Sequence, residues 1–191
     1  MKKARLALIT AQILALCAVA PGCSSSSSSS GPKVEIEMQD GGKIQLELDS
    51  KNAPITVENF VSLVSSGFYD GLTFHRIIPD FMIQGGDPEG TGMGGSDTNI
   101  KGEFSGNGVD NKISHVRGVI SMARSQDNDS ASSQFFITNA DSTFLDGEYA
   151  AFGTVISGMD VVDKISAVPT TGGNENRPLE PVVIKSITII D

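Results

Sequence analysis

The fold and chemistry of this chain are indicated most clearly by the stretch Phe74-His-Arg-Ile-Ile-Pro-Asp-Phe-Met-Ile-Gln-Gly-Gly-Asp87. It places an arginine, two bulky apolar side chains and an amide close together, at Arg76, Phe81, Met82 and Gln84. The stretch has no nucleophile beside a base and no spacing typical of metal ligands. Such a site can hold an apolar ring and hydrogen-bond a peptide backbone, but it is poorly equipped to break a covalent bond.

Short strand-like runs lie on both sides of this stretch. Residues 34–38 and 43–48 alternate apolar and polar side chains around a turn at residues 40–42, which predicts a β-hairpin. The other strand-like runs are residues 73–78, 81–84, 118–123, 133–138, 150–156 and 182–190.

Two helices are predicted from the spacing of apolar residues. The first begins at Pro54 and ends before Gly67, with an apolar face made of Val57, Phe60, Val61 and Val64. The second covers residues 159–168, with Val161, Ile165 and Val168 facing inward. Many short strands with two helices indicate a mainly β fold, closed or nearly closed, with helical caps.

Residues 85–112 interrupt this pattern with nine glycines and few large apolar side chains. A loop of this length in a compact domain is often functional.

The first 22 residues read as a secretory signal rather than as part of the fold. A basic start is followed by an apolar stretch at residues 6–20, which is short for a membrane span. Small residues precede Cys23, an arrangement that resembles a lipoprotein signal in which the cysteine becomes the lipidated first residue. Pro21 is uncommon in that pattern, so ordinary cleavage to a soluble secreted or periplasmic product stays an alternative.

The segment after the signal predicts a tether. Ser24–Ser30 is an unbroken serine run, which cannot form a core. We therefore expect a signal peptide at residues 1–22, a lipidated cysteine and serine-rich linker at residues 23–32, and one folded domain at residues 33–191. The other cysteine, Cys17, lies inside the signal, so the mature domain must fold without a disulfide.

The charge of the chain argues against nucleic acid as a partner. The net charge is −9, and loss of the three basic residues of the signal would bring it to about −12. Such an acidic surface repels phosphate backbones.

One reaction needs only the groups in the opening stretch: rotation about the peptide bond before proline. The barrier to this rotation is about 18–20 kcal/mol, because the planar amide loses its resonance when it twists. In the twisted state the nitrogen lone pair becomes a hydrogen-bond acceptor, so a fixed donor aimed at it binds that state best. Arginine suits this role, and an apolar socket would hold the proline ring.

In these residues the chain resembles the cyclophilins, which are peptidyl-prolyl cis–trans isomerases. The resemblance covers residues 33–191 and is carried by five segments, residues 74–87, 90–95, 121–123, 133–137 and 144–147. It implies a closed eight-stranded antiparallel β-barrel capped by two helices, no cofactor or metal, proline-containing polypeptides as substrates and a monomeric state.

The resemblance also assigns roles to single residues. Arg76 matches the catalytic arginine, and Gln84 matches the amide that braces it. The walls of the proline pocket correspond to Phe81, Met82, Phe136 and Leu145. The remaining matched positions on the groove are Ala123, Arg124, Gln134, Phe144 and Tyr149.

Three of these positions depart from the common family pattern. Phe144 stands where many members carry tryptophan, which puts sensitivity to the inhibitor cyclosporin in doubt. Tyr149 stands where many members have histidine. The pattern of this chain resembles that of exported bacterial cyclophilins. Arg124 replaces a frequent asparagine, and its charge would favour substrates with acidic flanks.

Other interpretations of the same residues stay open from the sequence. Taken alone, Arg76 would be read as a surface ion-pair partner, but Phe81, Met82, Gln84 and Phe136 in register favour the catalytic role. The apolar residues taken alone would be read as ordinary core. His75 and His115 are the only histidines, and structural roles are favoured over metal binding or base catalysis. Residues 85–95 lack the ending of a phosphate-binding loop. The acidic residues Asp127, Asp129, Asp141, Asp146 and Glu148 lack the spacing of a calcium loop.

Two functions from different classes fit these residues. The first is an extracytoplasmic, lipid-anchored prolyl isomerase that assists the folding of exported proteins. The alternative is a non-catalytic module or holdase chaperone that binds proline-containing segments. Retention of both Arg76 and Gln84 favours the enzyme, because a binder needs only the apolar socket.

Overall fold

The computed structural model describes residues 31–190 of the 191-residue chain. The predicted signal, Cys23 and the serine run lie outside the described residues. Within residues 31–190, none of the helices combines the length and the apolar character needed to cross a bilayer.

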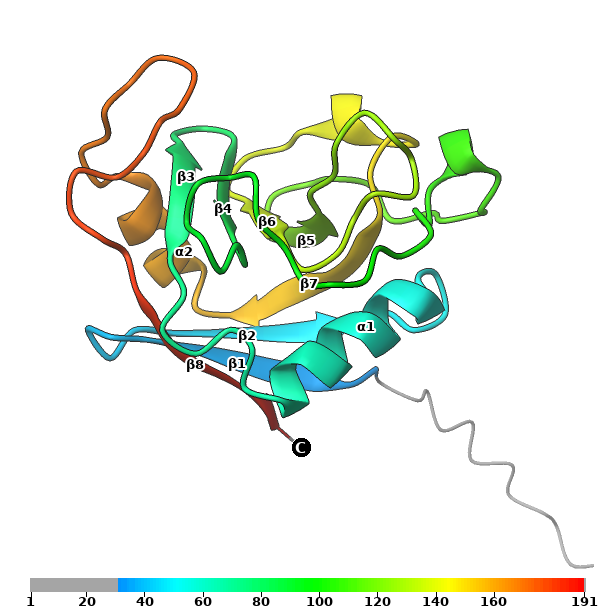
Figure 1. Ribbon diagram of the computed structural model, residues 1–191, viewed down its shortest axis with the longest axis horizontal. Helices are drawn as coiled ribbons and strands as arrows, with labels where there is room; N and C mark the ends of the chain where they lie inside the picture. Colours follow the sequence, from blue (N-terminus) through cyan, green and yellow to red (C-terminus); the bar gives the residue numbers. More distant parts are fainter. Residues whose placement is uncertain (1–30, 191) are drawn as a thin grey trace, which may run out of the picture.

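One antiparallel sheet of eight strands forms the body of the molecule (Figure 1). The order of the strands across the sheet is β3-β4-β6-β5-β7-β2-β1-β8. Their bounds are β1 Lys33–Met38, β2 Lys43–Leu48, β3 Phe74–Ile78, β4 Met82–Gly85, β5 Val119–Met122, β6 Phe135–Thr138, β7 Ala151–Ser157 and β8 Ile184–Ile190. The predicted hairpin and all the predicted strand-like runs are confirmed to within about two residues at most of their ends.

The two edges of the sheet, β3 and β8, meet only where each strand begins. A single bridge joins Thr73 to Val183, and Phe74 N donates to Val182 O at 2.9 Å. The rest of the two strands does not form a ladder. The prediction of eight antiparallel strands with two helices is therefore confirmed as a curled sheet, whereas the predicted full closure is not.

Helix α1, Pro54–Ser65, covers the core from one side. Its Phe60 ring lies 5.2 Å from the ring of Tyr69, 5.6 Å from Phe135 and 5.2 Å from Phe152, measured between centroids. Val57, Phe60 and Val64 are buried as predicted, while Val61 is only half-buried. This aromatic cluster makes α1 part of the hydrophobic core.

Helix α2, Met159–Ser166, is shorter than predicted. It ends two residues before Val168, which precedes Pro169 and is therefore disfavoured in the helical conformation. Val162 and Ile165 are the apolar residues that it buries, whereas Val161 and Val168 are half-buried. Ile165 is therefore buried as predicted, Val161 and Val168 pack against the core while staying partly exposed, and the fully buried Val162 was not predicted.

The N-terminus of α1 is capped by a residue from the glycine-rich loop. Ala53 offers no side-chain cap, and instead Glu103 accepts hydrogen bonds from Ile55 N at 3.1 Å and from Thr56 N at 2.7 Å. The Glu103 side chain also accepts from Thr56 Oγ1 at 2.7 Å, and the residue is only 2% exposed. The long loop is thus attached to the helix by a buried carboxylate.

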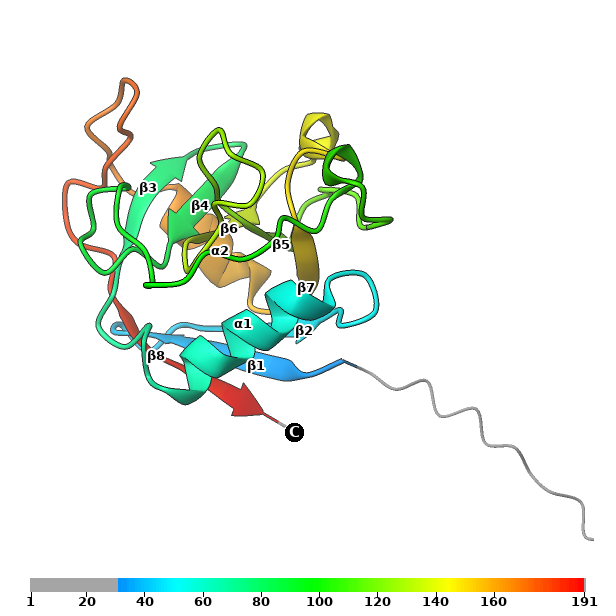
Figure 2. The same cartoon turned by 45° about the vertical axis from the view of Figure 1, so that its right-hand side comes forward.

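Asp87 orders the next part of the same loop. Its carboxylate accepts backbone hydrogen bonds from Glu89, Thr91, Gly92 and Gly94, at 2.6 to 3.3 Å. Figures 1 and 2 show several of the long loops on the side of the molecule away from the β1–β2 hairpin, while part of the glycine-rich loop runs past α1, to which Glu103 attaches it. This loop-covered side carries the candidate site.

Candidate active site

The register of three neighbouring strands places the key polar and aromatic residues side by side. Arg76 on β3 is paired with Gln84 on β4, and Gln84 is paired with Phe136 on β6. Residues paired across a ladder point to the same face of the sheet. The three side chains therefore form one row on the surface of the sheet.

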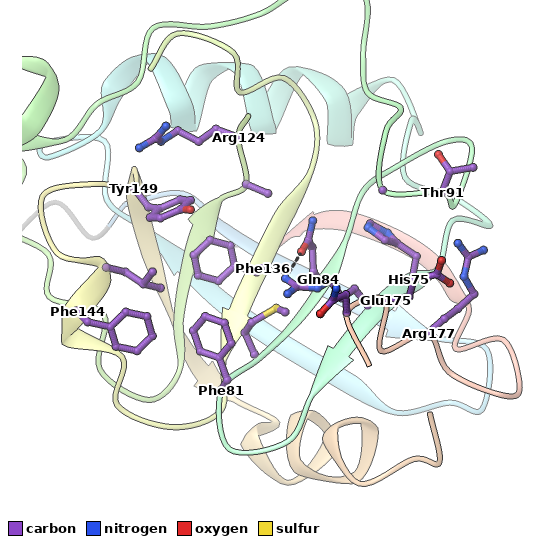
Figure 3. A pocket seen from close by; sticks show the side chains of 16 residues that line it. His75, Phe81, Gln84, Thr91, Arg124, Phe136, Phe144, Tyr149, Glu175 and Arg177 are labelled. Carbon is purple, nitrogen blue, oxygen red and sulfur yellow. Dashed lines mark hydrogen bonds between the residues drawn. The ribbon is translucent and has the colours of Figure 1, made fainter. Parts of the chain in front are cut away.

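A chain of hydrogen bonds orients the amide in this row. Arg76 Nη1 donates to Gln84 Oε1 at 3.3 Å, and Gln84 Nε2 donates to Gln134 Oε1 at 2.8 Å. Gln134 Nε2 donates in turn to Gly94 O at 2.7 Å, which attaches the chain to the loop that Asp87 orders. Each donor is paired with an acceptor, so the Gln84 oxygen points at the arginine (Figure 3).

Arg76 forms no ion pair with any described residue. The alternative in which it serves as a surface ion-pair partner therefore has no partner among residues 31–190. Its guanidinium is held by an amide instead, which leaves its charge available to a bound group.

An apolar socket lies beside the arginine and is separate from the main core. Met82, Phe136 and Leu145 are buried in a cluster of their own, against which Phe81 and Tyr149 pack. The Phe136 ring meets the Tyr149 ring edge-on at 5.9 Å. These residues were equally compatible with the core in sequence, and the structure assigns them to a surface socket.

The socket and the polar row line one groove with a volume of about 590 Å³ (Figure 3). All but one of the predicted site residues line it: Arg76, Phe81, Met82, Gln84, Ala123, Arg124, Phe136, Phe144, Leu145 and Tyr149. Gln134 does not line the groove and holds Gln84 through the hydrogen bond described above.

Six further residues line the groove without having been predicted as site residues: His75, Thr91, Gly92, Asn174, Glu175 and Arg177. Thr91 and Gly92 belong to the glycine-rich loop that the sequence marked as functional. Residues 174–177 lie in a loop without apolar periodicity, so the sequence carried no signal that would bring them to the groove.

Arg124 is largely engaged within the protein. Its guanidinium carbon lies 5.0 Å from the ring centroids of both Phe104 and Tyr149, a cation–π arrangement. Its Nε donates to Glu148 O at 2.9 Å, and its side chain is 11% exposed. Little of the Arg124 charge is therefore free to attract the acidic substrates that were expected from the sequence.

A hydrogen-bonded group of side chains, buried at His115 and Ser121 and exposed at Asp146, supports the socket from behind. His115 Nδ1 lies 2.8 Å from Asp146 Oδ1, and His115 Nε2 lies 3.0 Å from Ser121 Oγ. The His115 ring stacks on Phe136, with 6.1 Å between centroids and 16° between planes. Ser121 is fully buried and does not line the groove, so this serine, histidine and aspartate act as a scaffold rather than as a nucleophilic triad.

The two histidines differ in how their ring nitrogens are paired. Burial lowers the pKa of His115, and Asp146 opposes that effect. Burial also lowers the pKa of His75, whose two ring nitrogens have no hydrogen-bond partner among the described residues. A satisfied structural role, favoured from the sequence for both, fits His115 and not His75.

Comparison with known proteins agrees with this geometry. The family model for the cyclophilin type peptidyl-prolyl cis-trans isomerase/CLD matches residues 33–189. Peptidyl-prolyl cis-trans isomerase A of Dickeya dadantii is 48% identical over 160 residues, which cover 78% of this chain and 80% of the relative. Peptidyl-prolyl cis-trans isomerase ppi1 of Schizosaccharomyces pombe is 43% identical, over 81% of this chain and 98% of the relative.

Solved structures show the same similarity. A cyclophilin type peptidyl-prolyl cis-trans isomerase of Cryptosporidium parvum superposes with a TM-score of 0.75 at 32% identity, covering 84% of this chain and 98% of that one. A crystal structure described as the same protein in the presence of the dipeptide Ala-Pro gives the same TM-score at 33% identity, covering 83% of this chain and 99% of that one. The chain therefore belongs to the family of cyclophilin-type peptidyl-prolyl cis-trans isomerases.

Proposed function

We propose that the groove binds an X-Pro segment with the proline ring in the socket of Met82, Phe136 and Leu145. In this position Arg76 lies at the edge of the socket, beside the prolyl amide. The guanidinium then donates to the amide nitrogen as the bond twists, and Gln84 braces the guanidinium and contacts the peptide backbone.

Catalysis in this arrangement comes from differential binding. The planar cis and trans amides offer no nitrogen lone pair, whereas the twisted amide does. A donor that is already in place binds the twisted state more tightly than either planar state, and this lowers the barrier. Each factor of ten in rate needs about 1.4 kcal/mol of this difference, so a few hydrogen bonds suffice. The reaction requires neither proton transfer nor a covalent intermediate.

A single observation carries this assignment. Arg76 is held at the socket by the Gln84 amide and by no carboxylate among the described residues. A module that only binds proline would need the socket, but not an uncompensated cation fixed at its edge. The arrangement therefore supports catalysis over the holdase alternative.

The test is an isomerisation assay with a proline-containing peptide, by protease coupling or by exchange NMR. We expect Arg76→Ala to lower turnover by about a hundredfold or more, because the hydrogen bonds to the twisted state are lost. Peptide affinity should fall much less, because the socket remains. Arg76→Lys keeps the charge but loses the rigid set of N–H donors of the guanidinium, so its turnover should stay well below that of the wild type.

Two results would count against the enzyme. Wild-type turnover in Arg76→Ala would refute the catalytic assignment. Background activity in the wild-type protein, together with measurable peptide binding, would favour the non-catalytic module.

We also propose that the protein is exported and anchored to a membrane through a lipid on Cys23, with residues 33–191 acting as a monomeric domain on a serine-rich tether. This rests on the basic start, the apolar stretch at residues 6–20 and the small residues before Cys23. Mass spectrometry of the mature N-terminus should find an acylated Cys23, and light scattering should give the monomer mass. An unmodified terminus would reduce the proposal to secretion without an anchor.

A further inference from the structure

The arginines of the described residues divide into two classes. Arg117 pairs with Asp163 at 2.7 Å, and Arg124 pairs with Glu148 at 3.4 Å. Arg76 and Arg177 have no carboxylate partner within residues 31–190, and both line the groove. In a chain with a net charge of −9, acidic groups are in excess, so two unpaired guanidinium groups in one groove are a specific feature.

The second unpaired arginine marks the end of the groove away from the aromatic socket. Figure 3 shows Arg177, His75 and Thr91 on one side of Gln84, with Phe136 and Phe81 on the other. Thr91 is exposed, and its hydroxyl donates to Asp87 Oδ2 at 3.4 Å and accepts from Met93 N at 3.1 Å. The end of the groove is thus polar and cationic, whereas the socket is apolar.

His75 is the second, independent observation at this end. It is only 7% exposed, yet neither ring nitrogen has a partner among the described residues. Burial lowers its pKa, and the nearby Arg177 and Arg76 add to that effect, while Asp87 opposes it. Both ring nitrogens lie below the surface of the groove, so the charged donors exposed at this end are those of Arg76 and Arg177.

We propose that Arg177, next to His75 and Thr91 in the wall of the groove, forms a subsite for an acidic side chain near the substrate proline. This inference rests on the proposed function of the same groove. A carboxylate matches the two parallel N–H donors of a guanidinium group. The subsite supplies the acidic selectivity that the engaged Arg124 does not.

The geometry of the sheet sets the distance to the proline. His75 lies on β3, two strands away from Phe136 on β6, with β4 between them. Neighbouring strands are about 4.8 Å apart, so the subsite lies about 10 Å from the socket. An extended peptide covers that distance in about three residues, or in two plus the reach of a glutamate side chain.

Glu175 offers a second test of the subsite, with an expected effect opposite to that of Arg177. It also lines the groove and forms no ion pair with any described residue. Its carboxylate repels an acidic ligand, so its removal should strengthen the preference that removal of Arg177 weakens.

The experiment compares matched peptides that differ by glutamate or glutamine two residues before or two residues after the proline. The readout is the ratio of kcat/KM for the glutamate peptide to that for the glutamine peptide. At low salt we expect a ratio of about two- to fivefold at one of the two positions, the range of a solvent-accessible ion pair. The ratio should shrink as salt is added.

Three variants decide the origin of the preference. Arg177→Gln should bring the ratio close to one, and Glu175→Gln should raise it. Lys51→Gln removes one positive charge from outside the groove and should leave the ratio unchanged. A ratio of one at both positions in the wild type, or the same ratio in Arg177→Gln as in the wild type, would overturn the subsite.

Failure of the proposed function would look different. In that case the purified protein would not accelerate isomerisation of any of the peptides, including the glutamine ones. Fluorescence anisotropy with the same peptides would then test the subsite by affinity alone. The ratio of affinities for the glutamate and glutamine peptides should change in the three variants as the ratio of kcat/KM is expected to. The same results would overturn the subsite.

Discussion

Arg76 and Gln84 face each other across the β3–β4 ladder, and Arg76 Nη1 donates to Gln84 Oε1 at 3.3 Å. The bond is long for its type, so the amide orients the guanidinium without consuming it. The remaining N–H groups of the arginine stay available. An acid at position 84 would hold the same group much more tightly.

This relationship gives the first prediction. Gln84→Glu should lower kcat by about tenfold or more, because a carboxylate would form a charge-assisted pair with Arg76 and neutralise the charge offered to the twisted amide. The isomerisation assay measures kcat. Gln84→Leu is the matched variant, since it removes the brace without adding a charge, and it should be less impaired. A fully active Gln84→Glu would show that the reaction does not need an uncompensated charge on Arg76.

The second prediction concerns the cap that Glu103 provides for α1. Glu103→Ala should lower the free energy of unfolding by about 1–3 kcal/mol, because Ile55 N and Thr56 N lose their acceptor in a buried place. Glu103→Gln retains one acceptor oxygen and should cost less. Urea denaturation measures both. Equal stability of Glu103→Ala and wild type would contradict the role of this carboxylate.

The third prediction is a pH dependence. The pKa values of His75 and His115 are lowered from 6.5 by burial, so below that pH the unfolded chain binds protons that the folded chain does not. Stability should therefore be constant above about pH 7 and fall as the pH drops below the unfolded pKa. The limiting slope is about 1.4 kcal/mol per pH unit for each histidine. Denaturation at pH 7 and pH 5 tests it, and equal stability at both would contradict it.

The fourth prediction separates the two histidines by matched substitution. His75→Leu breaks no hydrogen bond of the described residues and should change stability at pH 7 little. His115→Leu leaves the buried Ser121 hydroxyl without its partner and removes one of the hydrogen bonds to Asp146, so it should cost about 1–3 kcal/mol. Each variant should halve the slope of the free energy of unfolding against pH between pH 7 and pH 5. Equal losses in the two variants at pH 7 would show that burial, rather than hydrogen bonding, decides their contributions.

The fifth prediction uses the position where this chain lacks the common tryptophan. Phe144 is 72% exposed at the rim of the groove, and its ring lies 5.5 Å from Phe81. Because that site is open, an indole would fit without disturbing the core. Phe144→Trp should therefore bind cyclosporin about tenfold more tightly than wild type, measured by inhibition of isomerisation. Phe144→Ala, as the control, should bind no better than wild type.

The sequence predicted what depends on local pattern and adjacent register. The hairpin of β1 and β2 and the buried face of α1 follow from alternation and helical spacing, and the structure confirms them. The placement of Arg76 beside Gln84 was expected only from the resemblance to the cyclophilins, and the β3–β4 register shows the two residues paired. The chemical roles assigned to these residues stay predictions until they are assayed.

What the sequence did not reveal depends on contacts between distant segments. Glu103 caps a helix that starts 49 residues earlier in the chain, and no periodic pattern encodes such a pair. Arg177 reaches the groove from a loop without regular structure. The incomplete closure of the sheet depends on where β3 and β8 begin, which strand propensity does not fix.

The loop whose backbone N–H groups donate to Asp87 has a practical consequence at its most exposed residue. Met93 is 89% exposed, while its neighbour Gly92 lines the groove and its other neighbour Gly94 accepts from Gln134. A dye attached there would lie in solvent next to the wall of the groove, where it could respond to a bound ligand. The only cysteines of the chain are Cys17 and Cys23, so Met93→Cys offers a nearly unique handle for a fluorescent reporter of groove occupancy.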